Sequence, residues 1–273
     1  MPLLTLLLLL ALLAGLGWLA RARRLRRERF ARIREVLLQV NVGEERFNPD
    51  SVDALPVPAA VYLRRALDPG ALLARSADVS MSGTLRVGAD DWVPFAARER
   101  ICAERGFIWE SRITVMRHLG AEGADWLLSD DAGVEYALAG WWPFLERRGP
   151  EMVRSAAGRL MVELAWLPSA LSPQHGARWS RGGTDRAVVT LPNGATPMTV
   201  VVADDGRLRE ASIVRRRVSA NGEVSLAPYG ISVEAETRFG DCRVPSRLVA
   251  AWGIGTDDRE EFMRINVDDV RWL

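Results

Sequence analysis

The sequence predicts an α+β fold: an N-terminal transmembrane helix, then a curved antiparallel sheet or open barrel of about ten strands with helices packed on its concave face. Three observations predict this fold. The first is an almost unbroken apolar run from Leu3 to Ala20. The second is the alternation of apolar and polar residues after residue 72, which is typical of strands with one exposed face. The third is a single helix-forming insert at about residues 149–173.

The apolar run is long enough to cross a membrane. Eight leucines lie between Leu3 and Leu12, and the run approaches the ~20 apolar residues that a helical span requires. We therefore interpret residues 1–20 as a transmembrane anchor. A cleaved signal peptide is the alternative, because Ala20-Arg21-Ala22 imitates a cleavage site, although no basic residue precedes the run.

A basic segment follows the apolar run. Between Arg21 and Arg34 there are eight arginines and one acidic residue, Glu28. By the positive-inside rule this segment predicts a single-pass protein of the inner membrane with a cytoplasmic main domain, and an extracytoplasmic domain is the alternative. Residues 21–54 are expected to form a basic helix at the membrane surface and then a polar linker. Residues 55–273 are expected to form a single β-rich domain.

The main domain is predicted to begin with a short helix at Val57–Leu67, which Asp68-Pro69-Gly70 ends. Asp205-Gly206 and Asn221-Gly222 are the strongest hairpin signals. The strands are too closely spaced for βαβ crossovers, so the sheet is expected to be antiparallel. Strand patterns cover residues 79–87, 92–101, 107–115 and 126–128 before the helical insert, and 187–191, 198–202, 208–218, 224–226, 231–237, 248–252 and 262–270 after it.

The insert at 149–173 is predicted to be a plug or lid over the inner face of the sheet. Gly149-Pro150-Glu151 begins its helix, with proline in the first turn and a carboxylate at the positive end of the helix dipole. The apolar stripe from Met152 to Leu164 is wide enough to need cover from the sheet. Arg159 and Glu163 are four residues apart on the polar stripe, where we expect an ion pair.

The composition excludes several functions. All 36 basic residues are arginine, so P-loop and Schiff-base lysine chemistry are excluded. Residues 21–35 hold eight arginines and two glutamates; outside them the chain has 28 basic and 33 acidic residues, which argues against nucleic-acid binding. Only two histidines, His118 and His175, are present, and no metal site or cofactor is predicted. Cys102 and Cys242 are expected to be separate buried thiols, with a disulfide as the alternative.

The number of tryptophans suggests a cavity. Nine of the ten tryptophans follow residue 90. They could line an apolar cavity between the sheet and the insert, with indole N–H groups as polar contacts for a ligand, or they could simply fill the core. No catalytic residue is assigned. The candidate ligand-binding residues are Trp92, Trp109, Glu163, Trp166, His175 and Trp179.

Several short motifs between residues 45 and 273 identify a family resemblance. They are Leu55-Pro-Val-Pro58, Trp92-Val-Pro-Phe95, Gly106-Phe-Ile-Trp109, Glu163-Leu-Ala-Trp166-Leu-Pro-Ser-Ala-Leu171, and Phe239-Gly240 through Val244-Pro245 to Trp252. As a set they resemble bacterial membrane-anchored proteins that share a domain of unknown function, a family without an established activity. More distantly, the strand–helix–strand order looks like the lipoprotein-carrier (LolA/LolB-like) fold, an unclosed antiparallel barrel with helices on its concave side.

Together these observations favour a membrane-anchored protein that binds an apolar or lipid-like ligand between the sheet and the helical insert. The expected partners are therefore the membrane and this ligand. One alternative is a non-enzymatic, envelope-associated structural or protein-interaction module, in which the tryptophans are core residues. A hydrolase that uses Glu163 or His175 is the third hypothesis.

Overall fold

The computed structural model describes residues 2–38, 44–88, 91–116, 119–192, 194–218 and 224–273. The α-helices are α1 (Pro2–Leu38), α2 (Val57–Ala66) and α3 (Pro150–Glu163), with short 3-10 helices η1 (Pro49–Val52), η2 (Leu164–Trp166), η3 (Pro168–Leu171) and η4 (Pro173–His175). The strands are β1 (Ser76–Val87), β2 (Asp91–Cys102), β3 (Gly106–Met116), β4 (Leu119–Leu128), β5 (Asp131–Leu138), β6 (Trp142–Arg148), β7 (Arg178–Arg181), β8 (Arg186–Thr190), β9 (Met198–Val202), β10 (Leu208–Val218), β11 (Val224–Phe239), β12 (Cys242–Trp252) and β13 (Glu260–Trp272).

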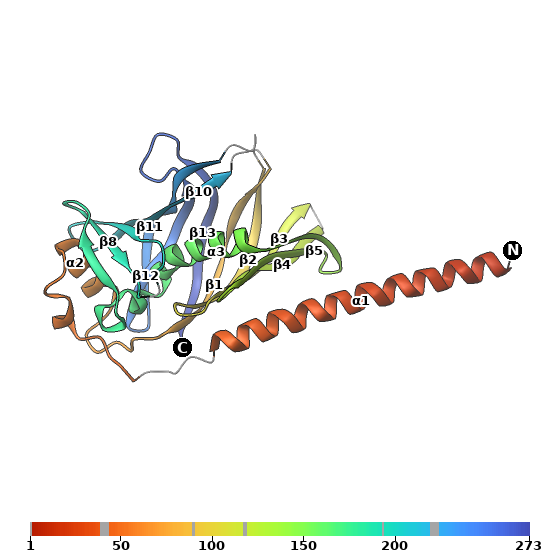
Figure 1. The fold of residues 1–273 in the computed structure, drawn as a ribbon, viewed down its shortest axis with the longest axis horizontal. Helices are drawn as coiled ribbons and strands as arrows, with labels where there is room; N and C mark the ends of the chain where they lie inside the picture. Colours follow the sequence, from red (N-terminus) through yellow and green to blue (C-terminus); the bar gives the residue numbers. More distant parts are fainter. Residues whose placement is uncertain (1, 39–43, 89–90, 117–118, 193, 219–223) are drawn as a thin grey trace.

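All strands belong to one open antiparallel sheet, in the order β6-β5-β4-β3-β2-β1-β13-β12-β11-β10-β9-β8-β7. Strands β1–β6 and β7–β13 are two meanders, which meet where β1 pairs with β13. β6 and β7 form opposite edges, so the segment from α3 to η4 carries the chain from one edge to the other. The sheet curves around α3 (Figure 1). We call the face that carries α3 the inner face and the opposite one the outer face.

The sheet has more strands than the predicted ten. β5 contains Ala132, Gly133 and Ala137, small residues that pack closely but give a weak strand pattern. β6 is an edge strand with almost no buried residue, so it lacks the alternation that marks a half-buried strand. The predicted patterns at 224–226 and 231–237 join into the single strand β11, which continues through Pro228. A proline inside a strand normally argues for a break.

One of the two predicted hairpin turns lies within the described residues. The hairpin at Asp205-Gly206 is confirmed: the Ala203 N–H donates to the Arg207 carbonyl at 2.9 Å, and Gly206 has φ +84°. A Cβ atom on Gly206 would lie 2.6 Å from the Val61 carbonyl oxygen of α2. The close packing of α2 against this turn therefore also requires glycine at position 206. The Asn221-Gly222 signal lies outside the described residues.

The main core lies between the inner face and the segment from α3 to η3. Leu160, Met161 and Leu164 belong to it, as the apolar stripe predicts. The helix approaches β10 very closely, because a side chain on Gly158 would lie 2.8 Å from Cδ1 of Ile213. Phe47 and Val52, which lie in the predicted linker, are also buried in this core.

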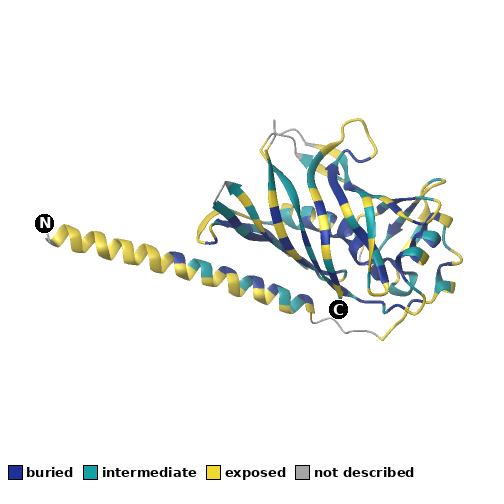
Figure 2. Cartoon of the chain, turned by 180° about the vertical axis from the view of Figure 1, so that it is seen from behind, coloured by how far each residue is buried: buried dark blue, intermediate teal, exposed yellow. Residues whose placement is uncertain are grey.

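α1 is one continuous helix with two different environments. Its first part is exposed, and its second part packs on the outer face of the sheet (Figure 2). There Phe30, Ile33 and Leu37 form a second apolar cluster with residues of β2–β4. The Phe30 and Trp126 rings lie 5.9 Å apart between centroids. The docked part of α1 therefore belongs structurally to the β-rich domain.

Several arginines of the basic segment bind the domain. Arg26 is buried and donates to the Gly140 carbonyl at 2.7 Å, while Arg29 and Arg34 form ion pairs with Glu135 and Glu110. These side chains are therefore held by protein carboxylates and carbonyls, although the sequence places them at the membrane surface. The arginines that remain exposed are Arg21, Arg24, Arg27 and Arg32.

Cys102 and Cys242 are free, buried thiols in different apolar clusters. Burial raises the pKa of the Cys242 thiol to about 12. Both cysteines therefore act as small core residues.

Candidate ligand-binding site

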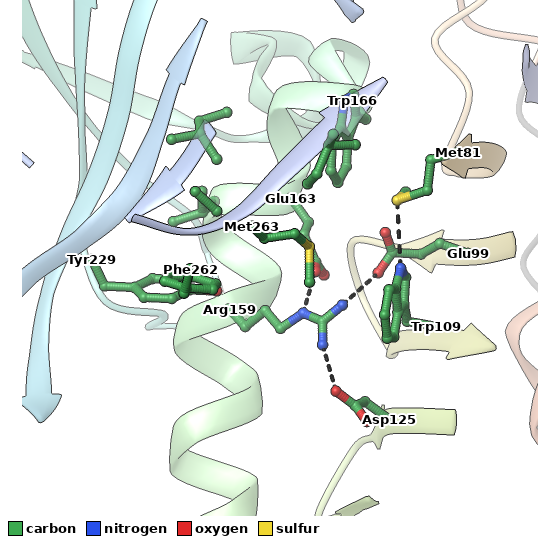
Figure 3. A pocket seen from close by; sticks show the side chains of 14 residues that line it. Met81, Glu99, Trp109, Asp125, Arg159, Glu163, Trp166, Tyr229, Phe262 and Met263 are labelled. Atoms are coloured by element: carbon green, nitrogen blue, oxygen red, sulfur yellow. Dashed lines mark hydrogen bonds and ion pairs between the residues drawn. The ribbon is translucent and has the colours of Figure 1, made fainter. Parts of the chain in front are cut away.

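A cavity of about 190 Å³ lies between α3 and the inner face of the sheet. Residues from both meanders contribute to its wall, and α3 with η2 covers it (Figure 3). The cavity is thus in the space that the sequence predicts, beneath the helical insert. It is lined by Met81, Glu99, Trp109, Asp125, Arg159, Val162, Glu163, Trp166, Tyr229, Ile231, Ala250, Phe262, Met263 and Ile265.

Arg159 is the centre of a buried polar cluster in this cavity. It forms an ion pair with Glu163, one turn later on α3, and its guanidinium lies 2.9 Å from the Asp125 carboxylate and 3.6 Å from that of Glu99 (Figure 3). The guanidinium also lies over the Trp109 ring, 5.3 Å from its centroid. A single guanidinium group therefore forms ion pairs with three carboxyl groups, which come from α3, β2 and β4.

Burial raises the pKa of all three carboxyl groups. The rise is large for Glu99, because the neighbouring Glu163 charge adds to the effect of burial and Arg159 offsets only part of it. The pKa values of Glu163 and Asp125 are raised by burial and pulled back by Arg159. Burial would lower the pKa of Arg159, but the three carboxylates together raise it well above its usual value. Glu99 is therefore the group that holds a proton most easily.

Four carboxyl oxygens of the cluster lack a hydrogen-bond donor among the described residues. They are both oxygens of Glu99, Oδ1 of Asp125 and Oε2 of Glu163. The Glu99 and Glu163 carboxyl groups are close enough for one proton to be shared between them. Buried polar atoms normally have partners. The unpartnered oxygens in the wall therefore indicate room for a proton, water or a ligand donor.

The rest of the wall is apolar and largely aromatic. The Trp109 indole N–H donates to Met81 Sδ at 3.4 Å, and that of Trp166 to the Pro245 carbonyl at 3.1 Å. Both indole N–H groups therefore have hydrogen-bond partners within the protein. Tyr229 and Phe262 stack with ring centroids 5.8 Å apart.

The structure brings three of the six predicted residues together. Trp109, Glu163 and Trp166 line the cavity. Trp92, His175 and Trp179 are not among its lining residues. Arg264 lies over the Trp92 ring, 4.4 Å from the centroid. The Trp179 N–H donates to the Leu171 carbonyl at 2.9 Å, which ties β7 to η3.

His175 lies in η4, beside a separate hollow of about 290 Å³ that Arg75 and Glu104 also line. Burial, together with the Arg75 charge, lowers the pKa of His175. Glu163 and His175 therefore line different cavities. His118 lies outside the described residues.

Sequence reasoning did not identify Glu99, Asp125 and Tyr229. The sequence does carry a signal for Glu99, because this residue shares the inward register of β2 with Phe95 and Ile101. A carboxylate in the apolar phase of a strand indicates a buried charge. Asp125 occupies the same phase in β4, opposite Trp109 of β3. Tyr229 follows Pro228, where the pattern favours a break between strands.

The cluster is not arranged as a metal site. Within the described residues, no group of three or more His, Cys, Asp or Glu side chains is placed to hold a metal ion. Arg159 occupies the position between the carboxylates that a cation would take.

Comparisons with known proteins give a family match. No curated protein matches the chain. Solved structures with limited similarity include a LolA superfamily protein from Nitrosomonas europaea, 11% identical, with a TM-score of 0.43 over 80% of this chain and 92% of that chain. A second is a domain from Vibrio parahaemolyticus proposed to be an outer membrane lipoprotein-sorting protein, 12% identical, with a TM-score of 0.38 over 72% and 85%. The model of a family of unknown function, DUF6544, matches residues 45–264, so the chain belongs to the DUF6544 family, as its motifs predict.

Proposed function

We propose that this is a membrane-anchored protein that binds an apolar or lipid-like ligand in the cavity beneath α3. The observation that carries this proposal is the cavity of about 190 Å³, whose wall combines aromatic and aliphatic side chains with three carboxyl groups. An engineered apolar cavity of about 150 Å³ is large enough to bind benzene. The cavity therefore suits one end of a lipid-like molecule, with the remainder of its chain outside.

The anchor is the exposed first part of α1. An 18-residue window of this helix has a mean hydropathy of 2.5 and is 6% buried, so by length and composition it could cross a membrane. The arginines that follow favour the cytoplasmic side for the domain. Docking of Phe30, Ile33 and Leu37 on the sheet joins the anchor rigidly to the domain. Such a joint holds the domain at a fixed orientation against the bilayer.

In this arrangement the β5–β6 hairpin lies at the level of the lipid headgroups. Arg23 and Arg26 hold Trp141 and Gly140, respectively, at this hairpin. At about 1.5 Å per residue, Arg23 and Arg26 are about 4.5 and 9 Å beyond Ala20. Arg23 therefore falls within a headgroup layer about 5–8 Å thick, and Arg26 lies just beyond it. Exposed aromatic residues near the tip suit an interfacial position: Trp141, Trp142 and Phe144 are 40%, 64% and 55% exposed.

Ligand binding is tested by native mass spectrometry of the full chain after extraction in a mild non-ionic detergent. We expect a co-purified small molecule. The Ala250→Met variant, which places a larger side chain in the cavity from β12, should lose this molecule and remain folded, with its free energy of unfolding lowered by no more than about 1–3 kcal/mol. Ala96→Met, on an exposed position of β2, is the matched control and should keep the molecule.

An empty cavity in the wild-type chain would instead favour the structural or interaction module. Cross-linking from the surface of residues 149–173 would then be expected to capture one specific partner protein. A ligand that stays bound in Ala250→Met would show that the binding site lies elsewhere.

Membrane placement is tested with a fluorophore on single cysteines, in a background where Cys102 and Cys242 are replaced by alanine. In vesicles that contain spin-labelled lipid, we expect the lipid to quench strongly the fluorescence of labels attached in the Trp18→Cys and Trp142→Cys variants. Leu226→Cys, on β11 and 72% exposed in the wild type, should be unaffected. Quenching at residue 18 alone would support the anchor and contradict contact of the hairpin with lipid. No quenching at residue 18 would contradict the anchor.

A further inference from the structure

We infer that the end of the ligand held in the cavity is a primary ammonium group. This inference rests on the proposed binding function and specifies its ligand. The first observation is the ratio of charges around Arg159, where Glu99, Asp125 and Glu163 face a single guanidinium. With all three carboxyl groups ionised, the cluster lacks two positive charges.

The second observation is that Glu99 is buried and, apart from the proton that it can share with Glu163, has no hydrogen-bond partner among the described residues. It is 2% exposed, it lines the cavity, and neither of its oxygens accepts a hydrogen bond from a described residue. When Glu99 is ionised, its two oxygens, Oδ1 of Asp125 and Oε2 of Glu163 are acceptors without a donor among the described residues. A primary ammonium group carries three N–H donors and one positive charge. A quaternary ammonium would supply the charge without the donors.

The walls are also suited to a cation. Trp109, Trp166, Tyr229 and Phe262 line the same cavity, and the faces of aromatic rings attract cations. A carboxylate or phosphate group would instead meet three acids at this end and would be repelled. An alcohol could donate only one hydrogen bond.

Binding exchanges a proton for the ligand. Burial and the Glu163 charge raise the pKa of Glu99 well above its usual value, so in the free protein Glu99 can hold a proton that it shares with Glu163. When the ammonium group enters, Glu99 releases its proton to solvent, and the resulting carboxylate accepts a hydrogen bond from the ammonium. The titratable groups around Glu99 that can influence this exchange are Asp125 from β4, Tyr136 from β5, Arg159 and Glu163 from α3, Arg215 from β10 and Tyr229 from β11.

Three octyl compounds that differ only at one end test the inference. Octylamine, octanol and octanoate are titrated into the full chain in non-ionic detergent at pH 8, and occupancy is measured by native mass spectrometry. Octylamine should bind at least about tenfold more tightly than octanol, as expected for one extra hydrogen bond to a charged group. Octanoate should not bind. Between pH 6 and pH 8 the affinity for octylamine should rise, while that for octanol stays constant.

The variant Glu99→Gln separates the charge from the shape of the site. It should reduce the octylamine affinity at least about tenfold, towards that of octanol in the wild type, and the matched variant Glu104→Gln, at an exposed glutamate beyond β2, should behave as wild type. Equal binding of all three compounds would leave the proposed binding function standing and overturn the ammonium preference. Binding of none of them would overturn both.

Discussion

Replacing Arg159 with leucine is expected to lower the free energy of unfolding by about 3–5 kcal/mol at neutral pH, the usual cost of removing one partner from a buried charge cluster. The guanidinium is the only positive charge within ion-pair distance of Glu99 and Glu163 in the described structure. Without it, three carboxyl groups with pKa values already raised by burial would face one another. The variant also loses the cation–π contacts with Phe107 and Trp109.

The loss in Arg159→Leu should depend on pH in a defined direction. An acid whose pKa is raised in the folded state contributes its stability below the pKa of the unfolded state, and loses it as pH rises through the folded-state pKa. Removing Arg159 raises the pKa values of Glu99, Asp125 and Glu163 further. The destabilisation should therefore be smaller near pH 4, where these groups are protonated, than at pH 8.

Unfolding of the full chain in detergent, followed by tryptophan fluorescence at both pH values, measures this effect. The matched control is Arg154→Leu on the same helix, where a 60%-exposed arginine pairs with Glu151. An exposed pair of this kind contributes at most about 0.5–1 kcal/mol. Equal losses in the two variants, or a loss in Arg159→Leu that does not change with pH, would show that the cluster is not held together by Arg159.

The main architecture could be predicted because it depends on local patterns. Alternation sets the inner and outer faces of strands such as β2 and β3, and Gly149-Pro150 marks the start of α3. β6 could not be predicted, because an edge strand exposed on both faces needs no alternation. The order of the strands was also inaccessible. It depends on the pairing of β1 with β13, which are far apart in the sequence.

The site was predicted only in part for a related physical reason. Arg159 and Glu163 are four residues apart on one helix, so their spacing in the sequence predicts the ion pair. Glu99 and Asp125 reach the same guanidinium only through the register of β2, β3 and β4, which long-range pairing sets. The tryptophan count could not show which rings meet: Trp92 and Trp179 are not among the residues that line the cavity, and their rings pack against Arg264 and Tyr62.

Glu99→Gln is expected to stabilise the protein in the absence of ligand, by about 1–3 kcal/mol at pH 8, the range for a buried polar group that lacks partners. Burial and the Glu163 charge raise the pKa of Glu99 in the folded state. Glu99 therefore contributes most to stability in acid, and this contribution falls as pH rises above the pKa of the unfolded chain. Glutamine keeps the shape of the protonated acid and has no such loss, so the two proteins should converge near pH 4.

Unfolding curves from pH 4 to pH 9, with Glu104→Gln as the control, measure the difference between the two proteins. A Glu99→Gln variant that is less stable than wild type at pH 8 would make Glu99 an ordinary structural partner of Arg159. Combined stabilisation and loss of octylamine binding would mean that Glu99 lowers the stability of the free protein and is needed for ligand binding. Such opposition between stability and binding is expected of a functional site and not of a structural ion pair.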